Sequence, residues 1–390
     1  MSTFCLLPTD IKHSILKFLP LSDLYKFLAT SKSFYSLCTE KFWIQKIMAE
    51  FPSYLHRQPK HMNHKSWYQR LISSGTAVHT EDDQIIGYDV WKIYKLEEQI
   101  FYIDIFETLY FLGDKAYIDS RYALGPFHKT LKECYKGPDV PIKLQDNVID
   151  VYLGNNSVIL DSTGTVYSLG KKFNGSKQAK KFCKVMSNIK QIISRADSDN
   201  SCLLLSTTNT LYWLSDMFKD STGKAGLCQV ASNVCSAIQY DIPCTGIYYV
   251  TRDHQLISFR ETLDKDLPRL KRPMAIDRRD EDQYITDIIF DSGVQNIAMT
   301  SDDILIIDTD SKLWVYDTDF NKGKSLKFPH TFTQIIANPF SEETLFLDDK
   351  GVLYESPNGF FNVKISTLTI VDTNIVSAFP TESFTYIKSR

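Results

Sequence analysis

Few residues in this 390-residue chain have the types and spacing that bond-making chemistry requires. The run from Ser221 to Lys224 ends like a phosphate-binding loop, but the upstream glycine and the serine or threonine after the lysine are missing. The nucleophile motif of hydrolases, the HExxH motif of zinc proteases and the protein-kinase motifs are absent from the sequence. We therefore expect no catalytic residue, no cofactor and no enzyme activity.

Metal-ligating residue types are present, but they do not form complete sets. His56, His61 and His64 lie within nine residues, yet no cysteine or carboxylate in that segment completes a tetrahedral zinc site. Aspartates are dense between Asp302 and Asp319, where the residue is also favoured in turns because it hydrogen-bonds its own backbone. The eight cysteines form no CxxC pair, so reduced thiols in an intracellular protein are the simpler interpretation. We expect no metal site, and location in the cytoplasm, the nucleus or both.

Residues 6–51 instead indicate a set of short helices. Thr9 or Asp10 can cap the first of them. Aliphatic residues recur every four positions or nearly so, which places them on one face of each helix. These residues are Ile11, Ile15 and Leu19 on the first helix and Leu21, Leu24 and Leu28 on the second. A module of about 45 residues rarely builds a self-sufficient core, so part of this surface is expected to bind a partner.

The detailed pattern of this stretch resembles the F-box. It reads Leu7-Pro8-x-x-Ile11-x-x-x-Ile15-Leu16-x-x-Leu19, then Leu21-x-Asp23-Leu24 and Phe42-Trp43. The resemblance implies docking onto the Skp-family adaptor of a cullin–RING ubiquitin ligase. By position in the motif, the residues expected to face the adaptor are Leu7, Pro8, Ile11, Ile15, Leu16, Leu19 and Leu24. Phe42 and Trp43 are expected to lock the helices together, and the alternative is that all these residues are only the core of a small helical domain.

The first 75 residues differ in charge from the rest. They hold ten Lys and Arg against four Asp and Glu, whereas the whole chain has a net charge of −3. A basic module suits an acidic partner, with chance surface composition as the alternative. Within this part, residues 52–75 are interpreted as a helical linker, in which residues 65–72 form one more short helix. Trp67 and Leu71 are expected to pack that helix on the preceding ones.

From about residue 76 the chain carries an internal repeat. Each repeat has an aliphatic residue, a polar turn and a second aliphatic residue six places on, which predicts a β-hairpin. The pairs are Ile103 and Leu109, Leu160 and Val166, Leu205 and Leu211, Val250 and Leu256, Ile307 and Leu313, and Leu347 and Leu353. A further strand is predicted upstream of each hairpin, at Val90-x-x-Ile93, Val148-x-x-Val151, Ile189-x-x-Ile192, Val234-x-x-x-Ile238, Ile285-x-x-Ile288 and Phe332-x-x-Ile335.

Repeats of this kind, 40 to 57 residues apart, are typical of a β-propeller, because one small sheet cannot bury both of its faces alone. Residues 383–387 match the first hairpin strand once more, and an N-terminal strand near 84–90 would complete that last blade. Counting Ile387 as the seventh repeat, we predict a multidomain α plus all-β protein, with six blades as the alternative. Its parts are F-box helices at 1–51, the helical linker at 52–75 and a seven-bladed β-propeller at 76–390.

The blade pattern, clearest in residues 160–170, resembles the regulator-of-chromosome-condensation repeat family. The glycine-rich pattern of that family survives only around Gly154, Gly164 and Gly170. The resemblance therefore implies the architecture, and it does not extend to nucleotide-exchange activity.

Two basic segments lie between predicted strands and supply candidate substrate contacts. These contacts are Lys171, Lys172, Arg269, Lys271 and Arg272. Clustered Lys and Arg on loops suit phosphate groups or acidic peptides, with solvated loops as the alternative. A nucleic-acid partner is disfavoured because the domain is net acidic, and no apolar run is long enough to span a membrane.

The two resemblances together predict a substrate-recognition subunit of an SCF-type (Skp–cullin–F-box) ubiquitin ligase. Its partners would be the Skp-family adaptor, a cullin–RING ligase through that adaptor, and a protein substrate. The alternative is a non-ligase propeller scaffold or small-GTPase regulator with an adaptor-tethered helical module. An enzyme with a propeller active site is a third hypothesis, which requires charged residues clustered in the central channel.

Overall fold

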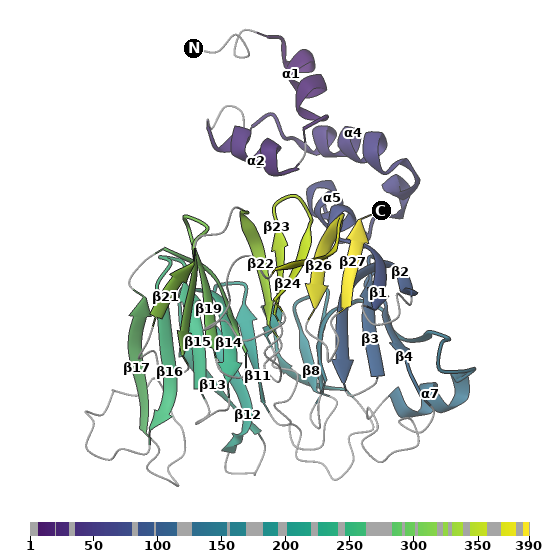
Figure 1. The fold of residues 1–390 in the computed structure, drawn as a ribbon. Helices are drawn as coiled ribbons and strands as arrows, with labels where there is room; N and C mark the ends of the chain where they lie inside the picture. The colour runs from purple at the N-terminus through teal and green to yellow at the C-terminus, as the bar shows by residue number, and fades with distance from the viewer. Residues whose placement is uncertain are drawn as a thin grey trace. The chain divides into compact units, whose positions relative to one another are not determined.

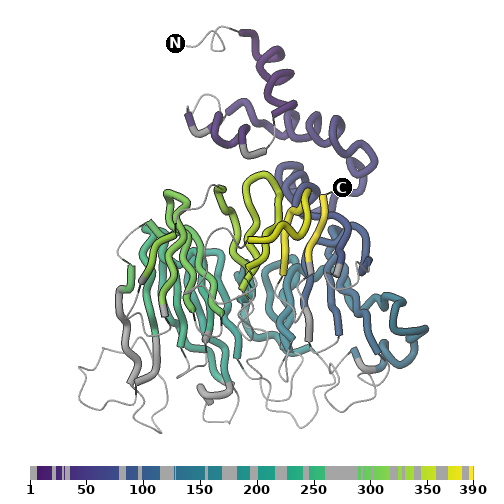
Figure 2. The backbone as a smooth tube through the Cα atoms, in the orientation of Figure 1, coloured from purple at the N-terminus to yellow at the C-terminus, as the bar shows by residue number. Residues whose placement is uncertain are grey.

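The computed structural model describes most of the chain, drawn in colour in Figure 2. The described ranges are 7–19, 21–30, 36–79, 85–96, 99–114, 127–153, 157–168, 182–193, 201–219, 225–240, 246–262, 283–290, 293–300, 303–317, 323–326, 330–337, 344–356, 368–379 and 385–389. The chain divides into two compact units. The helical unit comprises residues 1–75 with 389–390, and the β unit comprises residues 76–388.

The helical unit is built from short helices around an aromatic core. Its elements are α1 (Thr9–Leu16), α2 (Leu21–Ala29), α4 (Glu40–Glu50), the 3-10 helix η2 (Pro52–Arg57) and α5 (His64–Ile72). Phe42 and Trp43 are at most 2% exposed and meet edge to face, with ring centroids 5.2 Å apart. Trp43 in turn contacts Tyr68 of α5 at 5.5 Å. The prediction that Phe42 and Trp43 lock the helices together is therefore confirmed, as is the burial of Trp67 and Leu71, both 0% exposed.

The start of α1 differs from the sequence prediction. The residue preceding the helix is Pro8, which provides no side-chain cap, and Thr9 and Asp10 already lie in the first turn. Asp10 still suits that position, because a carboxylate is favoured near the positive end of the helix dipole. The N-termini of α4 and α5 do have side-chain caps: Thr39 accepts a hydrogen bond from the Phe42 N–H at 3.5 Å, and Asn63 accepts one from the Ser66 N–H at 2.8 Å.

The β unit consists of antiparallel sheets, in which strands that follow one another in the chain are neighbours (Figure 1). In the described residues there are five four-stranded sheets and one seven-stranded sheet. The four-stranded sheets are β6–β9 (Val148–Tyr152, Val158–Asp161, Val166–Ser168, Cys183–Met186), β10–β13 (Ile189–Ile193, Ser201–Ser206, Leu211–Lys219, Ala225–Ala231), β14–β17 (Val234–Tyr240, Gly246–Thr251, Leu256–Thr262, Gln283–Phe290), β18–β21 (Val294–Met299, Asp303–Asp308, Leu313–Asp317, Gly323–Leu326) and β22–β25 (Phe332–Ala337, Thr344–Asp348, Leu353–Ser356, Thr369–Asp372). The first strands of successive sheets contact one another, as they do around the axis of a propeller.

The seven-stranded sheet joins strands from both ends of the β unit. Its order is β26-β27-β1-β2-β3-β4-β5, so the yellow strands β26 and β27 lie beside the blue strands β1 and β2 (Figure 1). The strands are β26 (Ile375–Phe379), β27 (Thr385–Ser389), β1 (Gly75–His79), β2 (Ile85–Leu96), β3 (Gln99–Asp104), β4 (Leu109–Leu112) and β5 (Ile142–Gln145). The helix α7 (His128–Cys134) lies between β4 and β5 in the chain. This sheet leaves no gap between the N-terminal and C-terminal strands of the unit.

All six predicted hairpins are present, in one common register. In each of them the two aliphatic residues of the repeat are paired across the strands. These twelve side chains are at most 5% exposed. The strand predicted at residues 383–387 is represented by β27 and also follows the pattern, because Ile387 pairs with Ser377 and is 0% exposed. The aliphatic residues therefore sit between the sheets and form the core of the β unit.

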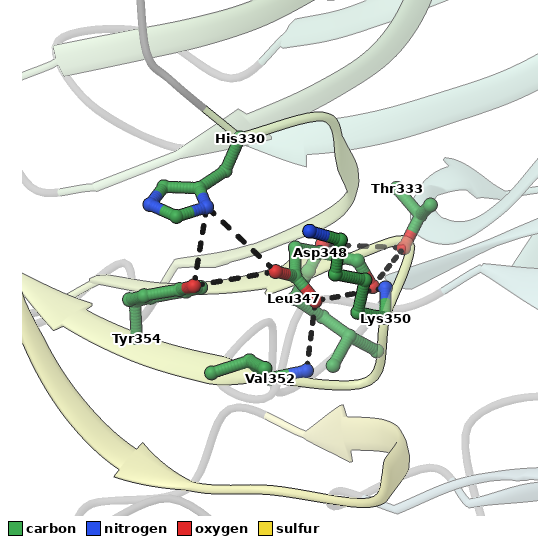
Figure 3. Close-up of polar contacts among 7 residues, drawn as sticks. All are labelled: His330, Thr333, Leu347, Asp348, Lys350, Val352 and Tyr354. Carbon is green, nitrogen blue, oxygen red and sulfur yellow. Dashed lines mark hydrogen bonds and ion pairs between the residues drawn. The ribbon is translucent and has the colours of Figure 1, made fainter.

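The polar turns of four of the six hairpins share one hydrogen-bond arrangement, shown for β23–β24 in Figure 3. The Oδ1 atom of Asp348 accepts hydrogen bonds from the backbone N–H groups of Lys350 (2.9 Å) and Val352 (2.8 Å). Its Oδ2 atom accepts a hydrogen bond from the Tyr354 hydroxyl at 3.2 Å, and Nδ1 of His330 lies 3.3 Å from the oxygen of that hydroxyl. Asp104, Asp161 and Asp308 bind the corresponding two N–H groups of their own turns. These contacts explain why four of the repeats carry aspartate at this position, where Ser206 and Thr251 accept a single N–H in the other two.

All six pieces predicted upstream of the hairpins are strands, and two of them differ from the others in detail. Ile285 and Ile288 belong to β17, the last strand of the β14–β17 sheet, and the first strand of the next sheet is β18 with Val294 and Ile297 buried. In β14 the buried partner of Val234 is Ala237, three places on, and not Ile238. In every first strand, and in the second half of β2, a register shift follows the first residue that pairs with the second strand. This shift keeps that residue and the third residue after it buried together.

Candidate functional site

The first candidate site is the outward face of α1 and the turn that follows it. Ile11 is 43% exposed, Ile15 is 42% exposed and Phe18, two residues beyond the end of the helix, is 74% exposed. Their spacing of four and three residues places them along one side of the helix. Leu16 is 0% exposed and faces the core of the helical unit. We name Ile11, Ile15 and Phe18 the α1 stripe.

The residues predicted to bind the adaptor divide into three groups. Leu16 and Leu24 are both 0% exposed within the helical unit, so they hold α1 and α2 in place and present no surface to a partner. Leu7 and Leu19 are partly buried, and Pro8 is exposed. Only Ile11 and Ile15 combine a large aliphatic side chain with high exposure.

Two exposed apolar residues of the helical unit were missed at the sequence level. The sequence could have indicated Phe18, since it lies three residues after Ile15 on the same helical face. The four-residue spacing favours Leu19 instead. Met48 on α4 is 54% exposed and belongs to no repeat of apolar residues that would have indicated it. Large exposed side chains of this kind are common in protein-binding surfaces.

The surroundings of the α1 stripe are basic. The Lys17 ammonium lies 5.0 Å from the centroid of the Phe18 ring, a cation–π contact at the end of the stripe. The sequence of the helical unit carries an excess of Lys and Arg over Asp and Glu. An apolar stripe with a cationic neighbour can bind an apolar groove that has acidic residues at its edge.

The second candidate site lies on the first strands of the β unit. The Lys92 ammonium on β2 is 3.0 Å from Oδ2 of Asp150 on β6, and the Asp150 side chain is only 5% exposed. Oδ1 of Asp150 accepts the Tyr94 hydroxyl at 2.5 Å, and Oδ2 accepts the Ile192 N–H of β10 at 3.0 Å. Burial, with Asp150 beside it, raises the pKa of Tyr94 well above its ordinary value.

This network connects three neighbouring sheets through one carboxylate. Both oxygen atoms of Asp150 accept hydrogen bonds from protein donors, and its charge is balanced by Lys92. A carboxylate engaged in this way is poorly suited to remove a proton from a substrate, because its lone pairs already face donors. We interpret the network as a structural link between sheets.

Other residues singled out in the sequence do not form a site in the described part of the chain. Lys171, Lys172, Arg269, Lys271 and Arg272 lie outside the described residues. His64 pairs with Glu40 across α4 and α5, and hydrogen bonds from its ring and backbone lower the pKa of Glu40. Within the described ranges, no three His, Cys, Asp or Glu side chains converge as metal ligands would, and no helix is long and apolar enough to cross a membrane.

Comparison with known proteins gives a family match for the helical unit, which is different from the structural matches described below. An F-box-like family profile matches residues 4–47, the part of the helical unit that contains α1 and α2 and most of α4. No curated protein sequence matches the chain. The family assignment of the N-terminal segment therefore agrees with the resemblance stated from its residues.

Solved structures match over most of the chain. Prp20p from Saccharomyces cerevisiae, described with its binding to Gsp1p and histones, has a TM-score of 0.53 at 13% identity, covering 85% of this chain and 96% of its own. Yeast RCC1 (Prp20) bound to Kap60 gives the same TM-score and identity, with 82% and 91% covered. At this identity the likeness concerns the fold alone. The chain thus carries an F-box-like segment at its N-terminus, followed by antiparallel sheets whose fold is similar to that of the regulator-of-chromosome-condensation propeller.

Proposed function

We propose that this chain is a substrate-recognition subunit of an SCF-type ubiquitin ligase. In this role the helical unit binds a Skp-family adaptor, and through it a cullin–RING ligase, while the β unit binds a protein to be ubiquitinated. The chain itself performs no bond chemistry. It raises the local concentration of substrate lysines near a conjugating enzyme that other subunits hold. Such a role implies action in the cytoplasm, the nucleus or both.

One observation carries the proposal: the α1 stripe is exposed inside the segment that matches the F-box-like family. A monomer gains stability by covering Ile11, Ile15 and Phe18, and three large side chains at one helical face are unlike scattered surface residues. Each side chain buried in a partner contributes on the order of 1–2 kcal/mol to binding. Together they are sufficient to account for a specific contact.

We further infer that the β unit is a seven-bladed propeller. Strand β2 pairs with β3 only from Val90 onward, and Asp89 before it has a φ of 57°. Equivalent connections between other sheets have Asn147, Asn188 and Asn233 with φ between 61° and 64°. The first half of β2 therefore corresponds to the last strand of a blade with β26, β27 and β1, and its second half begins the next blade. The seven-stranded sheet then counts as two blades beside the five others.

The test of adaptor binding uses the full chain with Ile11→Ala, Ile15→Ala and Phe18→Ala combined. We expect the affinity for a purified Skp-family adaptor, measured by calorimetry, to fall at least 100-fold, with the unfolding curve little changed because all three side chains are exposed. The matched control is Ile85→Ala, an aliphatic residue of the β unit that is 50% exposed. It should bind as the unaltered chain does, and absence of any adaptor binding by the unaltered chain would refute the proposal.

The alternative is a propeller scaffold or small-GTPase regulator without a ligase role, and the fold similarity to Prp20p, which is described with its binding to Gsp1p, motivates a test of it. The two hypotheses differ in what the chain does once the adaptor is bound. A substrate receptor should support ubiquitin transfer to a captured protein in a reconstituted ligase, and the triple variant should abolish that transfer. A GTPase regulator should bind or accelerate exchange on a GTPase equally well with and without the α1 stripe.

A further inference from the structure

One lysine of the helical unit is completely buried, with all three of its N–H donors in use. The Lys46 side chain on α4 is 0% exposed. Its Nζ donates to the carbonyl oxygens of Lys17 (2.8 Å) and Leu19 (2.9 Å) and to Oε1 of Glu50 (2.6 Å). Full burial of a lysine is unusual, and it occurs almost only where the ammonium group has hydrogen-bond partners.

The network extends from Lys46 to α5. The Tyr68 hydroxyl donates to Oε2 of Glu50 at 2.6 Å, and the Lys46 ammonium lies 5.1 Å from the centroid of the Tyr68 ring. Burial and the Glu50 carboxylate raise the pKa of Tyr68, so its hydroxyl stays a donor. The carboxylate supplies the charge that makes burial of the ammonium tolerable. The lysine is thus itself held in place from α4 and α5.

The two carbonyl groups bound by Lys46 lie on either side of Phe18. They follow the C-terminus of α1, which ends at Leu16, and a cation is electrostatically favoured near that end of a helix. Phe18 is 74% exposed and has little packing of its own to fix its position. The backbone on both of its sides is nevertheless anchored to a buried group on another helix.

We propose that Lys46 is a positioning residue for adaptor binding. It holds the backbone around Phe18, and hence the end of the α1 stripe, in the geometry that docks the partner, although its own side chain has no exposed surface to touch that partner. The inference rests on the proposed function and deepens it by assigning the residue that pre-organises the docking surface. Pre-organisation raises affinity because the ordering cost is not met at the moment of binding.

The test compares Lys46→Met with Lys41→Met in the full chain. Met keeps the length of the Lys46 side chain and removes its donors, and Lys41 is an exposed lysine on the same helix. We expect Lys46→Met to weaken adaptor binding by at least tenfold and to speed hydrogen exchange at the amides of residues 17–19. Lys41→Met should leave both measurements unchanged.

A double-mutant cycle separates positioning from a general loss of structure. If Lys46 acts through Phe18, adding Lys46→Met to Phe18→Ala should weaken binding by less than about threefold further. Fully additive effects of the two substitutions would overturn the proposal, as would unchanged affinity in Lys46→Met. If Lys46→Met does not fold, Glu50→Gln takes its place, because it keeps a hydrogen-bond acceptor and removes the charge opposite Lys46. Glu50→Gln should weaken adaptor binding about threefold. An unchanged affinity in Glu50→Gln would overturn the inference.

Failure of the inference and failure of the proposed function give different results. If the unaltered chain binds no adaptor, the proposed function is wrong and the assignment of Lys46 falls with it. If the unaltered chain binds and Lys46→Met binds equally well, only the positioning role is wrong.

Discussion

Two rows of apolar side chains in this protein have opposite solvent exposure. Along α1, Ile11, Ile15 and Phe18 are between 42% and 74% exposed. Along the hairpins of the β unit, the paired aliphatic residues are at most 5% exposed. The difference follows from size: each sheet has a neighbouring sheet to cover its faces, whereas the helical unit has too few elements to cover both sides of α1. The exposed apolar side chains of α1 therefore set this helix apart from the buried apolar rows of the β unit.

The largest expected effect contrasts these two rows directly. Leu205 is 0% exposed in the core of the β unit, and Leu205→Ala should destabilise that unit by about 3 kcal/mol, because it leaves a cavity. Ile15→Ala on α1 should cost less than about 1 kcal/mol, because the side chain is 42% exposed. Denaturant unfolding of the full chain, followed by tryptophan fluorescence and circular dichroism, measures both. Equal destabilisation by the two substitutions would show that the difference in exposure has no effect on stability.

The next effect concerns the polar turns that close the buried rows. Asp348→Ala removes the acceptor of two backbone N–H groups and of the Tyr354 hydroxyl, and should destabilise the β unit by about 2 kcal/mol. Its exposed neighbour Asp349 is the control, and Asp349→Ala should stay within about 0.5 kcal/mol. Thermal unfolding compares the two variants. If both behave alike, the turns do not depend on the repeated aspartate.

A smaller effect of opposite sign is expected at the third residue after the turn aspartate, where the backbone has a positive φ. Ser311 has a φ of 59°, while Gly164 and Gly351 occupy the same turn position with φ of 79° and 75°. Ser311→Gly should stabilise the β unit by about 0.5 kcal/mol, because glycine adopts this conformation without steric cost. The reverse change, Gly351→Ala, should destabilise it, since a Cβ atom would lie 3.0 Å from the Ile375 carbonyl oxygen. Chemical denaturation can resolve the two signs.

The smallest effect is a pH dependence of the helical unit. The His64 hydrogen bonds lower the pKa of Glu40 below its ordinary value of 4.5, so this contribution to stability is present above that pH and is lost as the pH falls through the folded-state pKa. Glu40 is 54% exposed, which limits the contribution to about 0.5 kcal/mol. Glu40→Gln should therefore lower stability at pH 7 and have no effect at pH 3. A difference that persists at pH 3 would contradict this assignment.

The hairpins could be predicted because their signal is local. Leu347 and Leu353 lie six residues apart with a polar turn between them, and a strand pair needs no more information than this. The strand predicted upstream of the fifth hairpin is β17, and β18 was not predicted, because Ile285 and Ile288 show the same spacing as Val294 and Ile297. Spacing alone cannot tell which of two adjacent strands begins a sheet.

The candidate docking surface could be predicted only in part, because helical spacing does not say which face is covered within the unit. Leu16 and Ile15 are neighbours in the sequence, yet one is fully buried and the other 42% exposed. Lys46 gave no signal at all, since its partners include backbone carbonyl groups 27 and 29 residues away. Carbonyl groups are the same in every residue, so no side-chain pattern indicates such a contact.

The seven-stranded sheet has a consequence for synthesis of the chain. Strands β1 and β2 must wait for β26 and β27, which span residues 375–389, before that sheet can be completed. The helices up to residue 72 leave the ribosome long before, and domains generally fold as units in the order of their emergence. In the proposed role, the helices that bind the adaptor would therefore be folded before the β unit that binds the substrate is complete.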